Sequence, residues 1–384
     1  MSSFDFSDVL RRMVEVNASD VHLTAGFPPA MRDKGKIVPM EGFPVLKPQE
    51  TRETVFSILN DDQRKRFENN KQLDFAYAIP GVARFRVNCF MQRGSVSAAF
   101  RLVPQDIPEL DSLGVPQVLR ELLQKPRGFI LVTGPTGSGK STTLAAMLDV
   151  INRERQDHIL TIEDPIEFLH QHKKSIVNQR EVGADADDFA LGLRAALRED
   201  PDVILVGEMR DLETISTALT AAETGHLVFA TLHTQSTAQT VDRIIDVFPP
   251  QQQGQVRTQL SIALQGIVTQ QLLPTADGMG RTVATEVLVP TPAIRNLIRE
   301  GKTHQIYAAV QTSGAVGMQT MDADLARLVR AGKITRSLAE QRASVPEELK
   351  RLLGSAPIAP PGMGGGGYAD QAAAPAPPSY VQGG

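Results

Sequence analysis

Eight residues near the middle of the chain have the types and spacing of a phosphate-binding loop. They run from Gly134 to Ser141 as Gly-Pro-Thr-Gly-Ser-Gly-Lys-Ser, directly after the apolar run 128–133. The glycines let the backbone turn so tightly that successive N–H groups point inward at phosphate oxygens. Lys140 would place its charge near the β- and γ-phosphates, and the Ser141 hydroxyl would face Mg²⁺. Residues 141–150 have an apolar helical period, so a helix would direct its positive end toward the phosphates.

This loop makes the chain a candidate nucleotide triphosphatase. A chance match in a glycine-rich turn is the alternative, but the pattern lies between a predicted strand and a predicted helix, as phosphate binding requires. The predicted nucleotide-binding residues of the segment are Gly134, Pro135, Thr136, Gly137, Ser138, Gly139, Lys140, Ser141 and Thr142.

A second segment ends a predicted buried strand with two carboxylates. The run 158–162 leads into Glu163 and Asp164. In a doubly wound parallel sheet the ligands gather at the carboxyl ends of the strands, so these side chains can hold Mg²⁺ or orient an attacking water. A polar strand-to-helix turn broken by Pro165 is the alternative interpretation.

A third segment looks like a Walker B strand. The apolar run 203–206 is followed by Gly207 and Glu208. Gly207 stands where an aspartate commonly holds the metal shell, so Glu208 alone would serve there. We predict that Ser141, Glu163 and Glu208 form the metal site, and which of the two glutamates is the general base stays open.

Two histidines bracket the strand predicted at 227–232. His233 follows the carboxyl end of the strand, where its ring can reach the γ-phosphate and report whether it is present. His226 precedes the strand and is the weaker candidate, with a structural or inter-subunit role as its alternative. We place His233 with the catalytic candidates and His226 with the nucleotide contacts.

Length and composition bound the class of protein. The chain has 384 residues, 41% of them hydrophobic, which favours two folded units. A net charge of −4 argues against bulk nucleic-acid binding. The single cysteine, Cys89, excludes a disulfide framework and a cysteine-rich zinc site, and it fits a reducing cytosolic compartment. Because no apolar stretch approaches the roughly 18 residues that span a bilayer, we expect any membrane association to be peripheral.

Local patterns divide the chain into four segments. Residues 1–103 combine helices with short strands and would form a small α+β domain. Prolines and a glycine punctuate residues 104–115, which we assign to a linker. Residues 116–354 alternate helices with nearly continuous apolar strands, which is typical of the buried parallel sheet of an α/β domain. Residues 355–384 are rich in proline, glycine and alanine, so we predict a disordered tail.

The four chemical segments occur in an order and spacing that resemble one known family. They are similar to the Walker A, aspartate, Walker B and histidine boxes of the secretion ATPase superfamily, whose members drive type II and type IV secretion and type IV pili. Residues 18–23, 293–302 and 317–320 are similar to segments of the branch that retracts pili. On spacing alone, residues 293–302 would be an ordinary surface helix with one apolar stripe.

The resemblance implies a PAS-like N-terminal domain followed by a RecA-like P-loop ATPase domain, with ATP and Mg²⁺ bound between them. It also implies that two arginines of the N-terminal domain reach the phosphates as the domains close, and Arg86 and Arg101 match those catalytic positions. The residues themselves place cations on one strand face, because Arg84 and Arg86 alternate with apolar neighbours. A solvated strand face is the alternative, chiefly for Arg84 and Arg93.

The implied function is that of an ATP-hydrolysing homohexameric motor that powers type IV pilus retraction and twitching motility. Its implied partners are an inner-membrane platform protein, the pilin fibre indirectly and a paralogous ATPase, with no nucleic acid. The motor would be cytoplasmic and peripheral at the inner face of the cytoplasmic membrane.

Four other functions compete with retraction. A pilus-extension or type II secretion ATPase shares the boxes, but usually adds an N-terminal domain and a four-cysteine metal site, from which this chain departs. An accessory retraction paralogue is disfavoured by residues 293–302 and stays open. A DNA-translocating motor is not supported, because the sequence has no basic, aromatic-rich strand or loop. A non-enzymatic nucleotide switch would need no water-orienting carboxylates such as Glu163 and Glu208.

Overall fold

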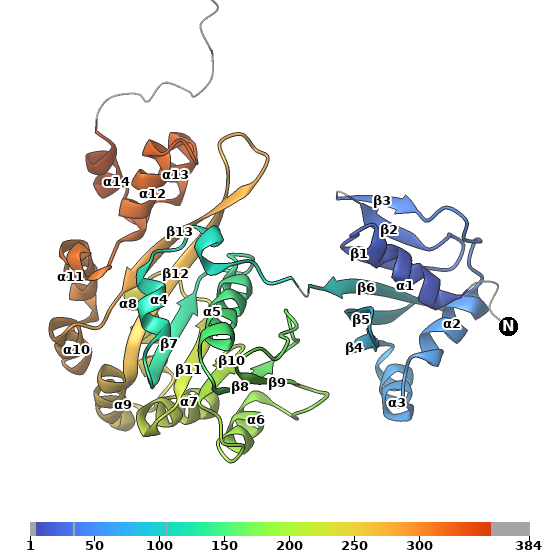
Figure 1. The fold of residues 1–384 in the computed structure, drawn as a ribbon, viewed down its shortest axis with the longest axis horizontal. Helices are drawn as coiled ribbons and strands as arrows, with labels where there is room; N and C mark the ends of the chain where they lie inside the picture. Colours follow the sequence, from blue (N-terminus) through green and yellow to red (C-terminus); the bar gives the residue numbers. More distant parts are fainter. Residues whose placement is uncertain (1–4, 34, 105, 355–384) are drawn as a thin grey trace, which may run out of the picture.

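The computed structural model describes residues 5–33, 35–104 and 106–354, so the predicted tail at 355–384 lies outside the described residues. Two β-sheets organise this part of the chain, and each has its own covering helices (Figure 1). The N-terminal sheet, in blue, connects to the larger sheet through the end of strand β6. The α/β class predicted from the sequence, with a smaller sheet domain before the parallel-sheet domain, is confirmed.

The first sheet is antiparallel. Within residues 5–33 and 35–104 its strands lie in the order β3-β2-β1-β6-β5-β4. The strands are β1 (Asp20–Leu23), β2 (Ala30–Asp33), β3 (Lys36–Pro39), β4 (Gln72–Ile79), β5 (Ala83–Gln92) and β6 (Ser95–Val103). The helices are α1 (Phe6–Glu15), α2 (Pro48–Ser57) and α3 (Asp61–Asn70).

One face of this sheet packs against the helices and the other carries cations. Along β5 the side chains of Phe85, Val87 and Cys89 are buried in a core that α1, α2 and α3 complete. Successive side chains of a strand point to opposite faces, so Arg84 and Arg86 emerge on the side away from the helices. The cationic strand face expected from the sequence is therefore left without a covering helix of its own domain.

The second sheet is parallel except at one edge. Among its described residues the order is β13-β12-β7-β11-β10-β8-β9, and only β12 with β13 pairs antiparallel. The strands are β7 (Gly128–Thr133), β8 (His158–Glu163), β9 (Ile176–Glu181), β10 (Val203–Val206), β11 (Leu227–Leu232), β12 (Leu264–Pro274) and β13 (Arg281–Leu288). The helices are α4 (Val118–Leu123), α5 (Lys140–Glu154), α6 (Phe189–Ala196), α7 (Leu212–Thr224), α8 (Thr237–Asp246), α9 (Pro250–Ala263), α10 (Pro292–Arg299), α11 (Ile306–Thr312), α12 (Met321–Arg330), α13 (Arg336–Arg342) and α14 (Pro346–Leu353), with short 3₁₀ turns η1 (Leu110–Leu113), η2 (Thr303–Gln305) and η3 (Gly314–Val316).

Helices cover both faces of this sheet, which explains its apolar strands. In β7, Phe129 and Leu131 join the core under α7 and α9, whereas Ile130 and Val132 join the core under α4 and α5. A strand buried on both faces has no polar side to present, so its sequence is a continuous apolar run. The parallel register then brings the carboxyl ends of β7, β8, β10 and β11 to one edge of the sheet.

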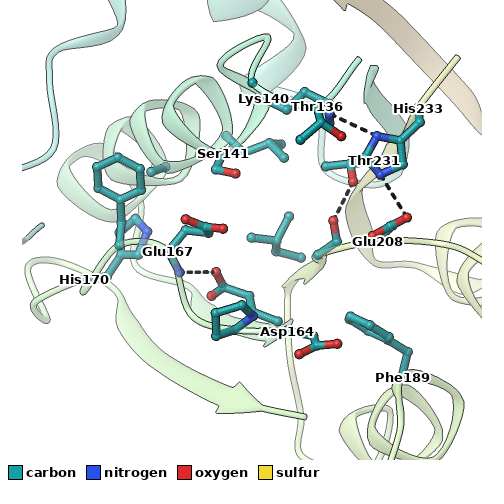
Figure 2. Close-up of a pocket in the computed structure, with 18 residues that line it drawn as sticks. Thr136, Lys140, Ser141, Asp164, Glu167, His170, Phe189, Glu208, Thr231 and His233 are labelled. Carbon is teal, nitrogen blue, oxygen red and sulfur yellow. Dashed lines mark hydrogen bonds and ion pairs between the residues drawn. The ribbon is translucent and has the colours of Figure 1, made fainter. Parts of the chain in front are cut away.

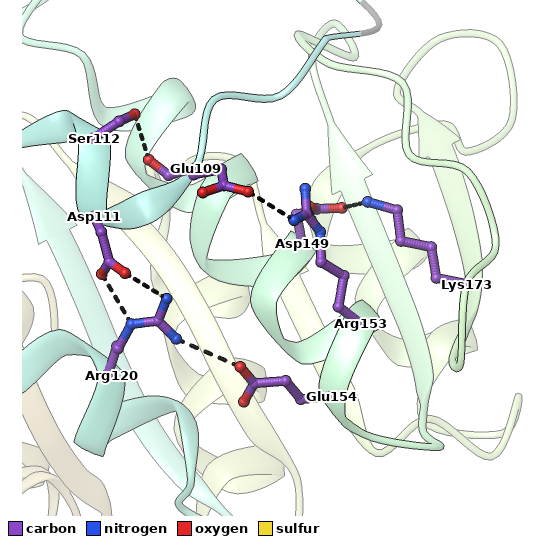
Figure 3. A network of polar contacts seen from close by, with 8 residues as sticks. All are labelled: Glu109, Asp111, Ser112, Arg120, Asp149, Arg153, Glu154 and Lys173. Carbon is purple, nitrogen blue, oxygen red and sulfur yellow. Dashed lines mark hydrogen bonds and ion pairs between the residues drawn. The ribbon is translucent and has the colours of Figure 1, made fainter.

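The start of the larger domain is tied to α5 by a network of ion pairs (Figure 3). Arg120 of α4 donates two hydrogen bonds to Asp111, at 2.9 and 2.8 Å, and its guanidinium is 3.4 Å from Glu154 of α5. Arg153 of α5 reaches Glu109 at 3.2 Å, and Leu110 is buried beside them in the α5 core. The second half of the predicted linker 104–115 is thus held against the larger domain.

The last helices pack on the antiparallel edge. Leu325 and Leu328 of α12 and Leu349 of α14 share a small core with Ala284 of β13. The buried carboxylate of Asp322 accepts hydrogen bonds from two backbone N–H groups before α14, at 2.9 and 3.0 Å. Across residues 5–33, 35–104 and 106–354, none of the helices combines the length and apolarity needed to cross a bilayer.

Gly317, in one of the segments on which the family resemblance rests, connects these helices to the sheet and provides a test of the packing. Its φ is +82°, and a Cβ there would lie 2.8 Å from two atoms of Val118. We expect Gly317→Ala to destabilise the fold by about 1–3 kcal/mol through backbone strain and overpacking, seen as a lower melting temperature. Gly314→Ala is the matched control, because its Cβ would meet nothing within 4 Å. Equal melting temperatures for the two variants would contradict this packing.

Candidate nucleotide-binding site

The phosphate loop joins β7 to α5, and strand β12 supports it from below. Gly134 has φ +137°, and a Cβ there would lie 2.3 Å from the carbonyl oxygen of Gln270. Gly137 and Gly139 also have positive φ values, of +78° and +89°. The side-chain amide of Gln270 donates to the carbonyl of Ser138 at 2.8 Å. The glycines therefore serve both the turn and the close contact with β12.

Lys140 is the cation at the centre of this loop. Its Nζ donates to the carbonyls of Gly134 and Pro135 at 2.9 and 3.1 Å, and it lies 3.5 Å from Nδ1 of His233. Burial lowers the pKa of Lys140, and the nearby carboxylate of Glu208 opposes that shift. The ammonium group is thus held over the loop by weak neutral acceptors that phosphate oxygens can replace.

Glu208 connects His233 to Arg210 at the end of β10. One of its oxygens is 3.0 Å from Nε2 of His233, and the other accepts from Arg210 at 2.7 Å. The hydrogen bond from Arg210 outweighs desolvation and holds the pKa of Glu208 below its ordinary value. Glu208 is therefore ionised at neutral pH, and Figure 2 shows its carboxylate beside His233.

Gly207 is needed where β10 passes β8. Its N–H donates to the carbonyl of Ile162 at 2.7 Å. A Cβ on Gly207 would lie 3.1 Å from that oxygen and 3.2 Å from Cα of Glu163, which is tighter than ordinary packing. This contact favours glycine at the position, and it brings the backbone before Glu208 close to that of Glu163.

Glu163 is a buried carboxylate held by neutral donors. It accepts hydrogen bonds from the hydroxyl of Thr161 at 2.7 Å, from the amide of Gln179 at 3.1 Å and from the backbone N–H of Glu167 at 3.3 Å. Burial is the largest influence and raises the pKa of Glu163 despite these bonds. The hydrogen bonds fix the orientation of the carboxylate, but burial deprives its charge of solvation by water.

One pocket brings both predicted glutamates and His233 together with part of the phosphate loop (Figure 2). Lys140, Ser141, Glu163, Glu208 and His233 all line it, with Thr136 and Gly137 of the loop. Among the described residues there is no cluster of three or more histidine, cysteine or acidic side chains that could hold a metal alone. Hydroxyl and carboxylate oxygens beside a phosphate loop suit Mg²⁺, which takes few protein ligands and completes its shell with phosphates and water.

The predicted arginines face the phosphate loop from the other domain. A second cavity is lined by Arg86 and Arg101 together with Gly139, Lys140 and Thr142. The side chain of Arg86 makes no hydrogen bond or ion pair within the residues that the structure describes. Arg101 donates to Asp20 at 2.8 Å while most of its side chain stays exposed. Both guanidinium groups therefore border the space that a bound nucleotide would share.

Three sequence candidates lie elsewhere. His226 is at the amino end of β11, where its Nδ1 is 3.0 Å from the carbonyl of Ala221, and it lines neither cavity beside the loop. Arg93 is in the turn between β5 and β6, far along the strands from the domain connection. Arg84 instead contacts the ATPase domain, through Glu181. The structure does not bring His226 to the other nucleotide contacts.

Several residues of the site escaped sequence reasoning. Gln179 and Gln270 hold Glu163 and the phosphate loop, and His170, Phe189 and Arg281 line the cavities. The two glutamines come from strands β9 and β12, which carry polar side chains and so lack a continuous apolar run. The only signal in the sequence was a polar residue within each strand. The group that each side chain contacts cannot be read from the sequence.

Comparison with known proteins relates most of the chain to one family. The sequence profile of the family described as type II/IV secretion system protein matches residues 63–336. The type IV pilus retractation ATPase PilT of Pseudomonas aeruginosa is 52% identical over 343 residues, or 89% of this chain and 99% of that protein. The type IV pilus ATPase PilU of the same organism is 44% identical over 349 residues, or 91% of each chain. A crystal structure of the pilus retraction motor PilT with bound ADP has a TM-score of 0.85 at 53% identity and covers 91% of this chain and 100% of that one.

The buried charge of Glu163 predicts a pH-dependent effect on stability in nucleotide-free, metal-free protein. Because the folded-state pKa is raised, the folded chain binds the proton more tightly, and stability is lost as pH rises through that raised value. We expect Glu163→Gln to melt a few degrees above the wild type at pH 8, with the difference shrinking as pH falls toward the ordinary carboxyl range. Thermal melts across pH measure this. Glu213→Gln, at an exposed glutamate of α7, is the control. A constant difference between Glu163→Gln and the wild type at all pH values would refute the linkage.

Proposed function

The chain belongs to the type II/IV secretion system protein family, and on that basis we propose that it is an ATP-hydrolysing hexameric motor that powers type IV pilus retraction and twitching motility. Its relative PilT is named a type IV pilus retractation ATPase, and the similar PilT structure holds ADP. The observation that carries the proposal is the meeting of Lys140, Glu208 and His233 in one pocket beside the phosphate loop.

Hydrolysis, rather than binding alone, is favoured by the two carboxylates. Lys140 would exchange the loop carbonyls for β- and γ-phosphate oxygens, which are stronger acceptors. A water positioned between Glu163 and Glu208 would attack the γ-phosphorus, while the bond to the bridging oxygen of ADP breaks and a carboxylate accepts the proton of the water. His233, between Lys140 and Glu208, would respond to the presence of the γ-phosphate.

The metal contacts are part of this proposal. Ser141 would supply a hydroxyl oxygen, and Glu163 or Glu208 would hold the hydrated ion through its carboxylate. When bound, Mg²⁺ supplies positive charge that neutralises the phosphate oxygens as the bond breaks. One glutamate can serve the metal shell while the other orients the water, which agrees with their positions at the carboxyl ends of the adjacent strands β8 and β10.

Domain closure is the step that would convert hydrolysis into movement. Arg86 and Arg101 border the cavity above the phosphate loop, so a γ-phosphate would draw them and their domain inward. Loss of that phosphate removes the contacts that favour the closed arrangement, and the domain returns. Successive closure around a ring of six chains would turn a platform protein of the inner membrane and so remove pilin from the base of the fibre.

We assign residues 1–103 to a PAS-like domain, 104–115 to a linker, 116–354 to a RecA-like ATPase domain and 355–384 to a tail outside the described residues. The motor would act in the cytoplasm, at the inner face of the membrane, with a paralogous ATPase as a further partner and without nucleic acid. Residues 293–302, whose first part forms α10, would carry ring movement to that machinery.

The accessory retraction role is the second candidate. PilU of Pseudomonas aeruginosa is 44% identical to this chain and covers it as fully as PilT does. The higher identity to PilT, 52%, favours the main retraction motor. The two candidates share the ATP site and differ in whether retraction continues without the partner ATPase.

Turnover of ATP by the purified chain is the first test of the site. We expect Glu208→Gln to reduce kcat by about a hundredfold or more while nucleotide still binds, because the substitution removes the charge of the carboxylate and keeps the shape of the side chain. Lys140→Ala should also lower nucleotide affinity. Glu213→Gln, on the exposed side of α7, is the matched control for a glutamate change and should retain turnover. Full turnover by Glu208→Gln would refute this site.

Retraction in cells tests the function itself. Cells that lack the gene should carry excess surface pili, and only the wild-type chain should restore shortening, because Glu208→Gln cannot complete the ATP cycle. Pili would be counted and their shortening timed by fluorescence microscopy. Absent pili in the deleted strain would instead indicate an extension ATPase, and unchanged retraction would indicate the accessory role.

A further inference from the structure

We propose that the ion pair between Arg84 and Glu181 is a positioning contact that couples the placement of the N-terminal domain to the orientation of Glu163 in the other domain. The inference rests on the proposed ATPase function, and it gives Arg84 a role distinct from that of Arg86 and Arg101. Three independent observations lead to it: the location of the pair, the second contact of Glu181 and the alignment of Glu181 with Gln179.

The pair spans the two sheets at a buried position. Nη2 of Arg84, on β5, is 3.0 Å from Oε2 of Glu181, the last residue of β9. The side chain of Glu181 is only 7% exposed and that of Arg84 23%. Within residues 5–33, 35–104 and 106–354, this is the ion pair that connects the six-stranded sheet to the seven-stranded sheet. Removal of the cation would leave a buried carboxylate without a charge partner, which is costly.

Glu181 also holds the loop that follows Glu163. The same oxygen that pairs with Arg84 accepts a hydrogen bond from the backbone N–H of Ile166 at 3.2 Å. One residue further on, the N–H of Glu167 donates to Glu163 at 3.3 Å. A shift of Glu181 therefore reaches the Glu163 carboxylate through one short piece of backbone.

A second path runs through β9 itself. Gln179 lies two residues before Glu181, so both side chains point to the same face of the strand. Its amide donates to Glu163 at 3.1 Å and to the carbonyl of Phe168 at 2.9 Å, and its oxygen accepts from the N–H of His170 at 2.8 Å. β9 thus presents one residue to the N-terminal domain and one to the buried glutamate.

The strand on the other side of the pair, β5, also carries Arg86, one of the two arginines proposed to reach the phosphates. Arg84 and Arg86 share a face of β5, and Arg86 lies directly opposite Arg101 of β6. A third cavity is lined by Arg84, Arg86, Ile166 and Glu181. When Arg84 pairs with Glu181, strand β5 fixes the position of Arg86 relative to the phosphate loop. The Glu181 carboxylate at the same time holds the loop that follows Glu163. Coupling between two sites is reciprocal, so nucleotide at the pocket would in turn stabilise the pair.

The test combines single and double variants of the full chain with kinetics. Arg84→Gln and Glu181→Gln each remove one charge, and Glu181→Gln keeps an oxygen for the N–H of Ile166. We expect each to lower kcat by roughly tenfold with KM within about twofold, because alignment for the chemical step is lost more than nucleotide binding. The double variant should be no slower than either single variant, since both break one contact. Arg84→Lys, which keeps a cation, should recover most of the turnover.

A matched control uses a second ion pair of β9. Arg180 pairs with Glu199 at 2.8 Å within the ATPase domain, and its side chain is 23% exposed, the same as that of Arg84. Arg180→Gln should leave kcat within about twofold of the wild type. The inference is overturned if the two single effects multiply in the double variant, or if melting temperature falls in the Arg84 and Glu181 variants while kcat does not.

A distance measurement separates this inference from the proposed function. A pair of dyes is attached to cysteines introduced by Asp62→Cys and Glu347→Cys. The native side chains at these two positions are 91% and 84% exposed. Cys89 would not compete for label, because it is buried and burial raises the pKa of its thiol to about 11. Labelled chains diluted in unlabelled wild type should show a shifted or broadened energy transfer when Arg84→Gln is added. Failure of the wild-type protein to turn over ATP would refute the proposed function. Unchanged energy transfer in the Arg84→Gln variant would refute the proposed contact between Arg84 and Glu181, whatever the turnover assay shows.

Discussion

The close approach of β10 to β8 at their carboxyl ends is the contact on which the rest of the site depends. Gly207 donates its N–H to Ile162 at 2.7 Å, and even a methyl group there would press on Glu163. Because the strands meet this closely, the carboxyl ends of β8 and β10 bring Glu163 and Glu208 to the lining of one pocket with Lys140. A side chain at position 207 would require Ile162 or Glu163 to shift by a few tenths of an ångström, which the glycine avoids.

The arginine face of the first sheet shows a complementary constraint. Arg86 and Arg101 are directly opposite on antiparallel strands, where like charges repel. Asp20, opposite Arg101 on β1, compensates one of them: burial acts to raise its pKa, but hydrogen bonds from Ser19 and Arg101 outweigh that and lower it. The other cation has no such partner in the described chain. A row of this kind is tolerable at an exposed face and becomes favourable when an anion binds there, which agrees with its place above the phosphate loop.

Sequence reasoning succeeded where burial leaves a local pattern. β7, β10 and β11 are buried along their whole length, and their bounds match the apolar runs. β9 and β12 were missed because Asn178, Gln179 and Gln270 interrupt their apolar patterns, and these side chains have roles only through partners from 16 to 132 residues away. The location of His226 away from the nucleotide contacts could have been predicted. Ligands of a parallel sheet gather at the carboxyl ends of its strands, and His226 precedes the amino end of β11.

The connection between the domains is short enough to restrict how they can move. Glu109 and Asp111 are bound to Arg153 and Arg120, and the carbonyl of Pro104 accepts from the N–H of Leu169 at 3.2 Å. A movement of the first sheet would therefore disturb the loop that follows Glu163, because that loop holds the carbonyl of Pro104. The N–H of Ile166 in the same loop donates to Glu181, the partner of Arg84. The end of the first sheet and the buried glutamate thus share one stretch of backbone.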